Sequence, residues 1–257
     1  MAAWLGRELK AAGDPTRALQ EKRYLKSEMA FYGCGRGAIR SAVARIKREH
    51  PNLDVASLRQ LVRMLWKEPV FERRIAAVIL LDSFGSLLRP ADIQLIERFL
   101  RESHTWALVD ELAGVVTGSL VERYPELNRT LDRWAVDDDF WLRRSAVLAL
   151  LRPLRRGGGD FVRFGRYADR MLEEREFFIR KAVGWVLRET AKKRPDLVYQ
   201  WLKPRMSRVS GVTVREAVRW LPPRQRDALL AAYRSPKARS RQSPGIEGRD
   251  GTDLQRI

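Results

Sequence analysis

The fold class is decided by one stretch of the sequence, Phe177-Phe178-Ile179-Arg180-Lys181-Ala182-Val183-Gly184-Trp185-Val186-Leu187-Arg188-Glu189. Its apolar residues recur at helical spacing, and we expect a helix from Phe177 to about Lys193. At about 100° per residue, one side of this helix collects the apolar stripe that should face the core. The residues of this stripe are Ile179, Val183, Val186 and Thr190, flanked by Ala182 and Leu187.

The start of this helix belongs to a repeat along the chain. An aromatic-x-Arg-Arg/Lys pattern opens three apolar helical runs: Phe71-Glu72-Arg73-Arg74, Trp141-Leu142-Arg143-Arg144 and Phe178-Ile179-Arg180-Lys181. Trp106 falls in the same phase, which gives intervals of 35, 35 and 37 residues. Helix pairs repeating at this period are typical of HEAT-like solenoids. We therefore predict an all-α fold without a sheet, a curved α-solenoid of HEAT-like antiparallel helix pairs with a basic concave face.

The charge of the chain points to an anionic partner. The 257 residues contain 50 Lys and Arg against 32 Asp and Glu, which gives a net charge of +18. Apolar periodicity stops near Tyr233, so we predict one folded domain over 1–233 and a disordered tail over 234–257. The tail has six basic and three acidic residues, and so +15 of the charge belongs to the folded body. A basic surface of this size favours a nucleic acid or another polyanion as partner.

Several classes of protein are excluded by composition. The longest apolar run, Ile75–Leu81, is far shorter than the roughly 18 residues that cross a membrane. The N-terminus lacks the pattern of a signal peptide, so we expect a cytosolic protein. A single cysteine, Cys34, excludes an internal disulfide, and with only His50 and His104 beside it a metal site or a histidine-based triad is not expected. We expect no metal and no cofactor, so any chemistry must use carboxylates, aromatic rings and cations.

The face of the Phe177–Lys193 helix opposite the core stripe combines cations with an aromatic ring. Lys181, Arg188 and Lys192 lie on this face, and Trp185 lies among them. Trp185 either packs against the neighbouring repeat or serves as a platform for a sugar or base within a phosphate-binding surface. The sequence leaves both interpretations open.

The helix that starts at Trp106 breaks the basic pattern with an acid. Trp106 and Asp110 are neighbours on one face because they are four residues apart. The small residues Ala113, Gly114 and Thr117 beyond them leave room for another helix or for a ligand. Asp110 is either a buried carboxylate that is bonded to a helix N-terminus or to an arginine such as Arg144 of the next repeat, or it has a catalytic role. A lone acid on a surface suited to phosphates weakens DNA binding, so its presence favours a function.

Other aromatic and basic residues allow two interpretations each. Arg144, on a helix expected to begin after Asp138 or Asp139, either clamps a phosphate or forms an ion pair between repeats. The stretch Lys22–Lys26 is either a solvated surface or part of a binding face. The remaining tryptophans are expected in the core without a functional role: Trp4, Trp66, Trp134, Trp201 and Trp220.

These residues resemble one known family, the AlkD-like alkylpurine DNA glycosylases, which are bacterial repair enzymes built from HEAT-like repeats. The stretch from Arg175 to Glu189 is similar to the family motif Phe-Phe-Ile-x-Lys-Ala-Ile-Gly-Trp-Val-Leu-Arg-Glu. Weaker similarities follow in the same order as in the family: Arg23-Tyr24-Leu25-Lys26 with Phe31-Tyr32-Gly33, Thr105-Trp106-Ala107-Leu108-Val109-Asp110, and Phe140-Trp141-Leu142-Arg143-Arg144. The resemblance covers the chain from about Tyr24 to beyond Ala217.

The resemblance implies a role for each matching residue. Trp106 and Trp185 resemble the two tryptophans that contact the deoxyribose of the lesion, and Asp110 resembles the catalytic carboxylate. DNA contacts are implied for Tyr24, Lys26, Arg144 and Arg188, and we expect one at Lys181 on the same cationic helix face. The family segment often reads Trp-Trp-Asp-x-Val-Asp, whereas this chain has Thr105 and Ala107 at its first and third positions.

The function expected from the resemblance is hydrolysis of the N-glycosidic bond of cationic alkylated purines, such as N3-methyladenine and N7-methylguanine, in duplex DNA. The enzyme would act as a monomer in the bacterial cytosol, and the lesion could remain stacked in the duplex. Two alternatives stay open. The first is a catalytically silent DNA-binding protein with the same fold, which the changes at Thr105 and Ala107 favour. The second is a HEAT-type scaffold whose basic strip binds an acidic protein.

Overall fold

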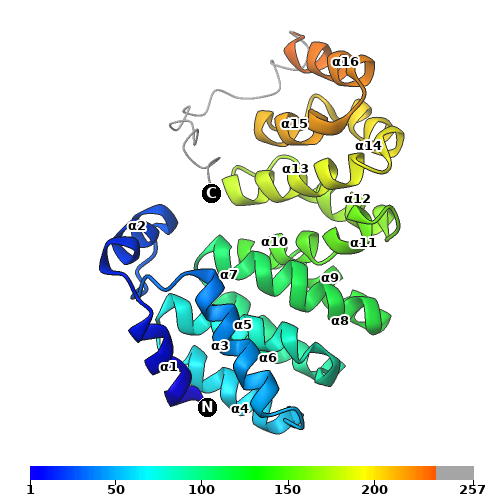
Figure 1. The fold of residues 1–257 in the computed structure, drawn as a ribbon. Helices are drawn as coiled ribbons and strands as arrows, with labels where there is room; N and C mark the ends of the chain where they lie inside the picture. The colour runs from blue at the N-terminus through cyan, green and yellow to red at the C-terminus, as the bar shows by residue number, and fades with distance from the viewer. Residues whose placement is uncertain (236–257) are drawn as a thin grey trace.

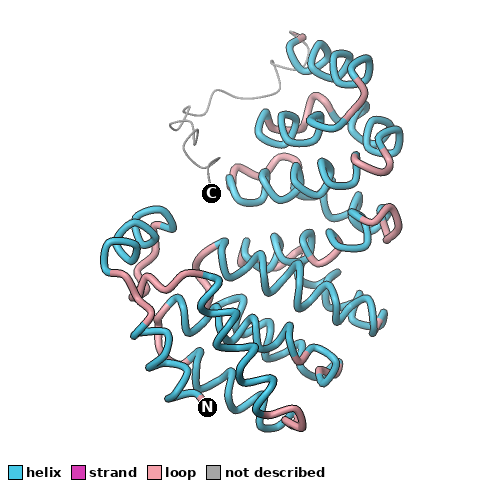
Figure 2. Tube along the Cα trace, in the orientation of Figure 1, coloured by secondary structure: helices cyan, strands magenta, loops and turns pink. Residues whose placement is uncertain are grey.

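The computed structural model describes residues 1–235, and this part of the chain is helical without a strand (Figures 1 and 2). Its last helix ends at Arg234, one residue beyond the predicted domain boundary. The predicted disordered tail lies outside the described residues from 236 onward. Two extended segments meet only at an isolated bridge between Ala30 and Val70.

The helices form antiparallel pairs in two layers, preceded by three N-terminal helices (Figure 1). The N-terminal helices are α1 (Ala2–Ala11), α2 (Pro15–Leu25) and α3 (Arg36–Glu49). The first helices of the pairs are α4 (Val55–Trp66), α6 (Ile93–Arg101), α9 (Asn128–Trp134), α12 (Phe161–Met171) and α14 (Pro195–Leu202), and α16 (Pro223–Arg234) follows the last pair. The second helices are α5 (Phe71–Ser83), α7 (Trp106–Glu111) with α8 (Gly118–Arg123), α10 (Phe140–Leu148) with α11 (Leu151–Arg155), α13 (Phe177–Ala191) and α15 (Gly211–Ala217).

The second helices begin where the repeat predicts. α5, α7, α10 and α13 start at Phe71, Trp106, Phe140 and Phe177, and each packs on its neighbour. The apolar stripe predicted for α13 is buried, and each residue of it is at most 1% exposed. The stack curves so that α2 and the start of α13 lie toward the same side as the start of α7 (Figure 1). The predicted helical solenoid is therefore confirmed.

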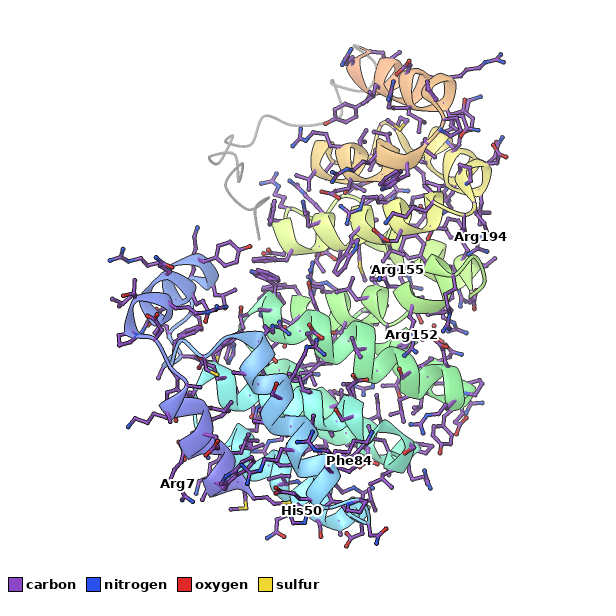
Figure 3. All side chains as sticks on the ribbon, viewed as in Figure 1. Arg7, His50, Phe84, Arg152, Arg155 and Arg194 are labelled. Atoms are coloured by element: carbon purple, nitrogen blue, oxygen red, sulfur yellow. The ribbon has the colours of Figure 1, made fainter. Side chains whose placement is uncertain are left out.

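The cations of the repeat pattern join one repeat to the next. Arg74 donates to the carbonyl oxygen of Glu102 at 2.6 Å, and Arg143 forms two hydrogen bonds with Glu174, at 2.8 and 2.9 Å. A second set of arginines connects the repeats along the edge away from α2, where Arg152, Arg155 and Arg194 lie (Figure 3). Many of the cations thus bind groups of the neighbouring repeat instead of facing solvent without a partner.

The connection between α2 and α3 is held by a buried acid. The carboxylate of Glu72, fully buried on α5, accepts hydrogen bonds from the backbone N–H groups of Tyr32, Gly33 and Cys34 at 3.0, 2.6 and 3.2 Å. Gly33 has a φ of +77°, and a Cβ there would lie 2.0 Å from the carbonyl oxygen of Asp14, so only glycine fits. This clamp fixes α2 beside the second helices.

Carboxylates on the first helices form a ladder of ion pairs between repeats. Glu97 of α6 binds Arg133 of α9 and the indole N–H of Trp134. Asp132 of α9 accepts a hydrogen bond from Arg163 of α12 at 2.6 Å. Further along, Asp169 of α12 accepts two hydrogen bonds from Arg205, both at 2.7 Å.

The ion pairs of Glu97 make the stability of the fold depend on pH. Hydrogen bonds from Arg133 outweigh burial and lower the pKa of Glu97 from 4.5 to about 2. A lowered pKa stabilises the fold above pH 4.5, and this contribution is lost as the pH falls toward 2. We expect Glu97→Gln to cost at most about 3 kcal/mol at pH 7 and almost nothing near pH 2. Urea unfolding of both proteins at pH 7, 4 and 2.5 measures this difference, and a difference independent of pH would contradict the account.

Candidate active site

The first tryptophan of the site is positioned by a sharp turn before α7. His104 adopts a left-handed conformation with a φ of +46°, and the extended Thr105 follows as the N-cap of α7. Trp106 is the first residue of the helix and remains partly exposed. Tyr24 of α2 packs edge-on against it, with ring centroids 5.9 Å apart and an interplanar angle of 81°. The N-terminal helices therefore support the indole from one side.

Asp110 lies one turn further along α7 and forms an ion pair with Arg144 of α10. The Nε and Nη2 atoms of Arg144 donate to the two carboxylate oxygens at 2.7 and 2.8 Å. The third nitrogen, Nη1, donates to the carbonyl oxygen of Phe178 at the start of α13. The side chain of Arg144 is 3% exposed, while that of Asp110 is 15% exposed. One arginine thus joins three successive second helices and holds the carboxylate in a fixed orientation.

A cluster of aromatic rings at the starts of α10 and α13 adjoins this ion pair through Phe178. Phe178 lies 5.1 Å from Trp141 and 5.5 Å from Phe177, measured between ring centroids. Phe140 lies 4.4 Å from Trp141, and the guanidinium of Arg144 lies 5.9 Å from the centre of the Phe178 ring. Phe177 is 39% exposed. The sequence analysis used aromatic residues at these helix starts only as evidence of the repeat. Because equivalent positions of successive repeats lie side by side, the same pattern could have predicted that the rings form a cluster.

The cations beside Trp185 share a buried acid. Lys181 and Arg188 of α13 both bind the carboxylate of Glu216 on α15, Lys181 at 2.5 Å. α13 and α15 approach closely because Gly184 lacks a Cβ, which would lie 2.7 Å from the Cβ of Glu216. Lys181 keeps 39% of its side chain exposed and Arg188 keeps 21%. Trp185 is partly buried against the core, so its indole is neither fully covered nor free.

Arg188 also contacts Glu189, which three cations surround. Burial alone would raise the pKa of Glu189, but Lys192, Arg155 and Arg188 hold it below its ordinary value. Glu189 therefore stays ionised at neutral pH and neutralises part of the charge on this face.

The two remaining predicted DNA contacts lie on and just after α2. Tyr24 is partly buried against Trp106, whereas Lys26 is exposed at the C-cap with a φ of +47°. Lys22 and Arg23 in the last turn of α2 are exposed as well. On the other side of the site, Arg175 is exposed just before α13.

The small residues after Asp110 lie against α10, and of the three only Gly114 stays partly exposed. Residues 112–117 form a π-helical segment between α7 and α8, and in it Ala113 and Thr117 are fully buried. A Cβ on Gly118 would lie 3.0 Å from the carbonyl oxygen of Ala149, so α10 packs against this segment. Of the two occupants considered, a helix, α10, lies beside these residues. Segments of this kind often adjoin functional sites.

The departures from the family pattern lie behind Trp106. Thr105 is 2% exposed and Ala107 is 5% exposed, so both side chains point into the protein. The Thr105 hydroxyl has no hydrogen-bond partner among the described residues. The exposed side of α7 therefore keeps Trp106 and Asp110 unchanged.

The prediction for one tryptophan was wrong. Trp220 was expected in the core, but it is 54% exposed, and the ammonium group of Lys192 lies 5.4 Å from its ring. It follows α15 on a short helical turn at the end of the stack, where no later second helix covers it among the described residues. Trp134, in contrast, is fully buried as expected.

Two classes of feature are absent from the described residues. Residues 1–235 contain no group of three or more His, Cys, Asp or Glu side chains that could hold a metal ion. None of their helices combines the length and the apolar character that crossing a membrane requires.

Solved structures similar to this chain share its fold. A predicted DNA alkylation repair enzyme from Enterococcus faecalis superposes with a TM-score of 0.75 at 20% identity, over 82% of this chain and 97% of that one. AlkD2 from Streptococcus mutans gives a TM-score of 0.58 at 19% identity, over 80% and 97% of the two chains. The smu.31 protein from Streptococcus mutans UA159 gives 0.55 at 19% identity, over 72% and 100%.

The sequence itself identifies the family. No curated protein matches it significantly. The family model described as DNA alkylation repair enzyme matches residues 5–221, which is most of the chain and includes the site around Asp110. Together with the helical-repeat fold, this match shows that the chain belongs to the DNA alkylation repair enzyme family.

Proposed function

We propose that the protein is a monofunctional DNA glycosylase that removes cationic alkylated purines, such as N3-methyladenine and N7-methylguanine, from duplex DNA. The observation that carries the proposal is the oriented carboxylate of Asp110. It is partly exposed beside Trp106, and a buried arginine bonds both of its oxygens. The membership in a DNA alkylation repair family supports the same conclusion.

The substrate class follows from the chemistry that the site lacks. Alkylation at N3 or N7 gives the purine a positive charge, so the base leaves as a neutral molecule and needs little help from a general acid. His104, the nearest histidine in the sequence, precedes α7 and is exposed. A site built from a carboxylate and aromatic rings is therefore sufficient for these lesions, whereas it gives little help to a neutral base.

Asp110 would act on the sugar. Breaking the N-glycosidic bond builds positive charge on the deoxyribose, as in glycoside hydrolysis. An ionised carboxylate held in place stabilises this charge without reorganising during the reaction. Each carboxylate oxygen keeps a lone pair beyond its bond to Arg144, and this lone pair can orient the water that attacks the sugar.

We propose that Trp106 and Trp185 contact the deoxyribose of the lesion. The face of an indole attracts positive charge, so two rings beside the sugar add to the stabilisation by Asp110. Tyr24 then acts by supporting Trp106, which it touches edge-on. Phe178 connects the two sides of the site, because it contacts Arg144 and lies seven residues before Trp185 on one face of α13.

The basic residues divide into two groups under this proposal. Lys26 is exposed, and Lys181 keeps 39% of its side chain exposed beside its ion pair with Glu216, so both can bind phosphates. Lys22, Arg23 and Arg175 are exposed nearby. Arg144 and Arg188 are mostly buried in ion pairs. We therefore propose that Arg144 positions Asp110 instead of clamping a phosphate, and that Arg188 supports the α13 surface.

The proposal is tested with a duplex that carries one N7-methylguanine. We expect the protein, acting as a monomer, to convert the lesion to an abasic site that alkali cleaves. Strand cleavage without alkali would indicate a lyase activity in addition. If no abasic site forms above the spontaneous rate while the duplex is bound, the protein is a silent DNA binder.

Trp185 gives a prediction that separates catalysis from binding. We expect Trp185→Ala to reduce excision by about tenfold or more, because one of the two ring faces beside the charged sugar is lost. Affinity for an undamaged duplex should change little, since phosphate contacts dominate it. Single-turnover excision and fluorescence anisotropy measure the two quantities. A parallel loss of both would assign Trp185 to packing or to DNA binding.

A further inference from the structure

The groove between α4 and α6 breaks the ladder of ion pairs on the first helices. Equivalent positions in these helices are marked by a buried triplet at spacing i, i+3, i+4. The triplets are Val62, Leu65 and Trp66 in α4; Ile96, Phe99 and Leu100 in α6; Leu131, Trp134 and the C-cap Ala135 of α9; and Ala168, Met171 and the C-cap Leu172 of α12.

The residue after the first member of each triplet faces the next repeat. In three helices it is an acid that binds arginine of the following repeat: Glu97, Asp132 and Asp169. In α4 the same position is Arg63. The charge at this one rung of the ladder is therefore reversed.

Arg63 stands where the other helices have the acid, and no acid elsewhere among the described residues binds its side chain. Among residues 1–235 the side chain of Arg63 has no hydrogen-bond or ion-pair partner, and Arg63 is exposed. Arg98 of α6, the cation of the facing helix, pairs instead with Glu102 on its own helix at 2.8 Å and stays 70% exposed. Arg59 is neutralised by Asp92, whose second oxygen accepts the backbone N–H of Arg89. Arg63 and Arg98 thus remain on the groove, and the one acid among its lining residues, Asp92, is already paired with Arg59.

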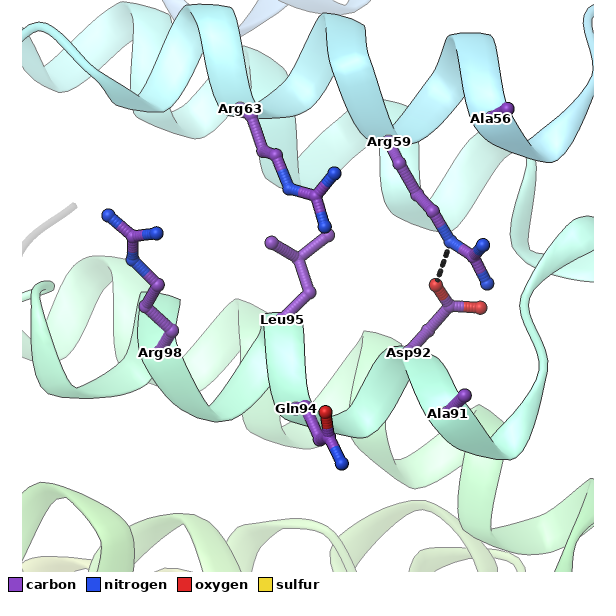
Figure 4. A pocket seen from close by; sticks show the side chains of 8 residues that line it. All are labelled: Ala56, Arg59, Arg63, Ala91, Asp92, Gln94, Leu95 and Arg98. Atoms are coloured by element: carbon purple, nitrogen blue, oxygen red, sulfur yellow. Dashed lines mark hydrogen bonds and ion pairs between the residues drawn. The ribbon is translucent and has the colours of Figure 1, made fainter.

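A pocket of about 510 Å³ opens at this rung. Arg59 and Arg63 from α4 and Arg98 from α6 project into it, and the carboxylate of Asp92 is turned to Arg59 (Figure 4). Leu95, Ala56 and Ala91 give the pocket an apolar wall, and Gln94 adds an amide at its edge (Figure 4). The pocket therefore combines the unpaired Arg63, and Arg98, which pairs only with Glu102 of its own helix end, with a surface for aliphatic groups.

We propose that this groove binds an acidic segment of a partner protein, whose carboxylates take the place of the acid that α4 lacks. Carboxylates fill the equivalent position in the next three repeats, and guanidinium groups bind them with defined geometry. The apolar wall accommodates the aliphatic part of Glu side chains, which a phosphate lacks. The groove lies on the first-helix layer, whereas Asp110 and its ring cluster lie on the second helices, so both surfaces can be occupied together.

The probe for this site is dye-labelled hexaglutamate, measured by fluorescence anisotropy at low salt. The protein is first saturated with an undamaged duplex, so that the DNA-binding surface is covered. We expect the peptide still to bind, and Arg63→Glu to weaken its binding at least about tenfold, because like charges then meet in the groove. Arg7→Glu is the matched control, since it makes the same charge change at an exposed residue of α1 (Figure 3).

The Arg63→Glu variant also tests the repeat argument without any ligand. A glutamate here restores the acid of the ladder beside Arg98, so the melting temperature should rise by about 1 to 3 °C. A lower melting temperature would contradict the equivalence of the four positions.

Four binding results would overturn the proposal. Hexaglutamate that binds Arg63→Glu as well as the wild type does not use the groove, and equal losses in Arg63→Glu and Arg7→Glu reveal attraction by net charge alone. Displacement of the peptide by inorganic phosphate at an equal concentration would assign the groove to a small phosphate ligand. Loss of peptide binding on saturation with duplex would make the groove part of the DNA-binding surface.

Discussion

Asp110→Asn is expected to lower the single-turnover rate constant for excision of N7-methylguanine by about 10²- to 10³-fold, the usual cost of removing one oriented electrostatic contact. The asparagine side chain keeps the shape of the site and can still accept a hydrogen bond from Arg144. It lacks the negative charge that the developing positive charge on the sugar requires. DNA affinity should stay the same or increase slightly, because a negative charge is removed near the phosphates.

The neighbouring acid provides the control for this substitution. Glu111 pairs with Arg36 at 2.8 Å and is 30% exposed, so Glu111→Gln makes the same chemical change one residue away. We expect this variant to excise at the wild-type rate. Excision that is unchanged in Asp110→Asn, or lowered equally in both variants, would remove Asp110 from the catalytic step.

Arg144→Met is expected to have the largest effect on stability, about 3 to 5 kcal/mol. The substitution leaves the carboxylate of Asp110 and the carbonyl oxygen of Phe178 without their buried donor. Excision should fall as well, because the freed carboxylate would turn toward solvent. Urea unfolding gives the loss of stability, and single-turnover excision at a temperature where the variant is folded gives the loss of activity.

Arg143→Met is the matched control for Arg144. Arg143 also binds a carboxylate with two hydrogen bonds, but its partner Glu174 is 22% exposed and lies away from Asp110. We expect a smaller loss of stability and normal excision. Arg144→Lys should recover part of the stability, since an ammonium group can bind one oxygen of Asp110 but lacks the planar fork. If Arg144→Met lost DNA affinity before any loss of excision, Arg144 would be a phosphate contact.

The repeat could be predicted from the sequence because it depends on local spacing. The aromatic-x-Arg-Arg/Lys pattern placed the starts of the second helices within one residue, and the N-cap of α10 is Asp139, one of the two expected residues. The pairing of Asp110 with Arg144 was one of two alternatives, and the fixed distance between successive repeats made it predictable.

The exposure of the cations was harder to predict, because it depends on contacts between helices. Lys181 and Arg188 share Glu216, which lies 28 residues or more along the chain, and no local pattern shows this contact. The π-helical segment at 112–117 changes which residues face α10, and a count at 100° per residue misses it. Trp220 looks like a core residue in the sequence, but its exposure results from its place at the end of the stack.

The most direct test of the proposed function compares two lesions in one duplex sequence. One duplex carries the cationic N7-methylguanine and the other carries a neutral damaged base, uracil, at the same position. A site that relies on a carboxylate and on the charge of the departing base should produce abasic sites from the first duplex and none above background from the second. Equal excision of both bases, or excision of uracil alone, would contradict the proposed mechanism.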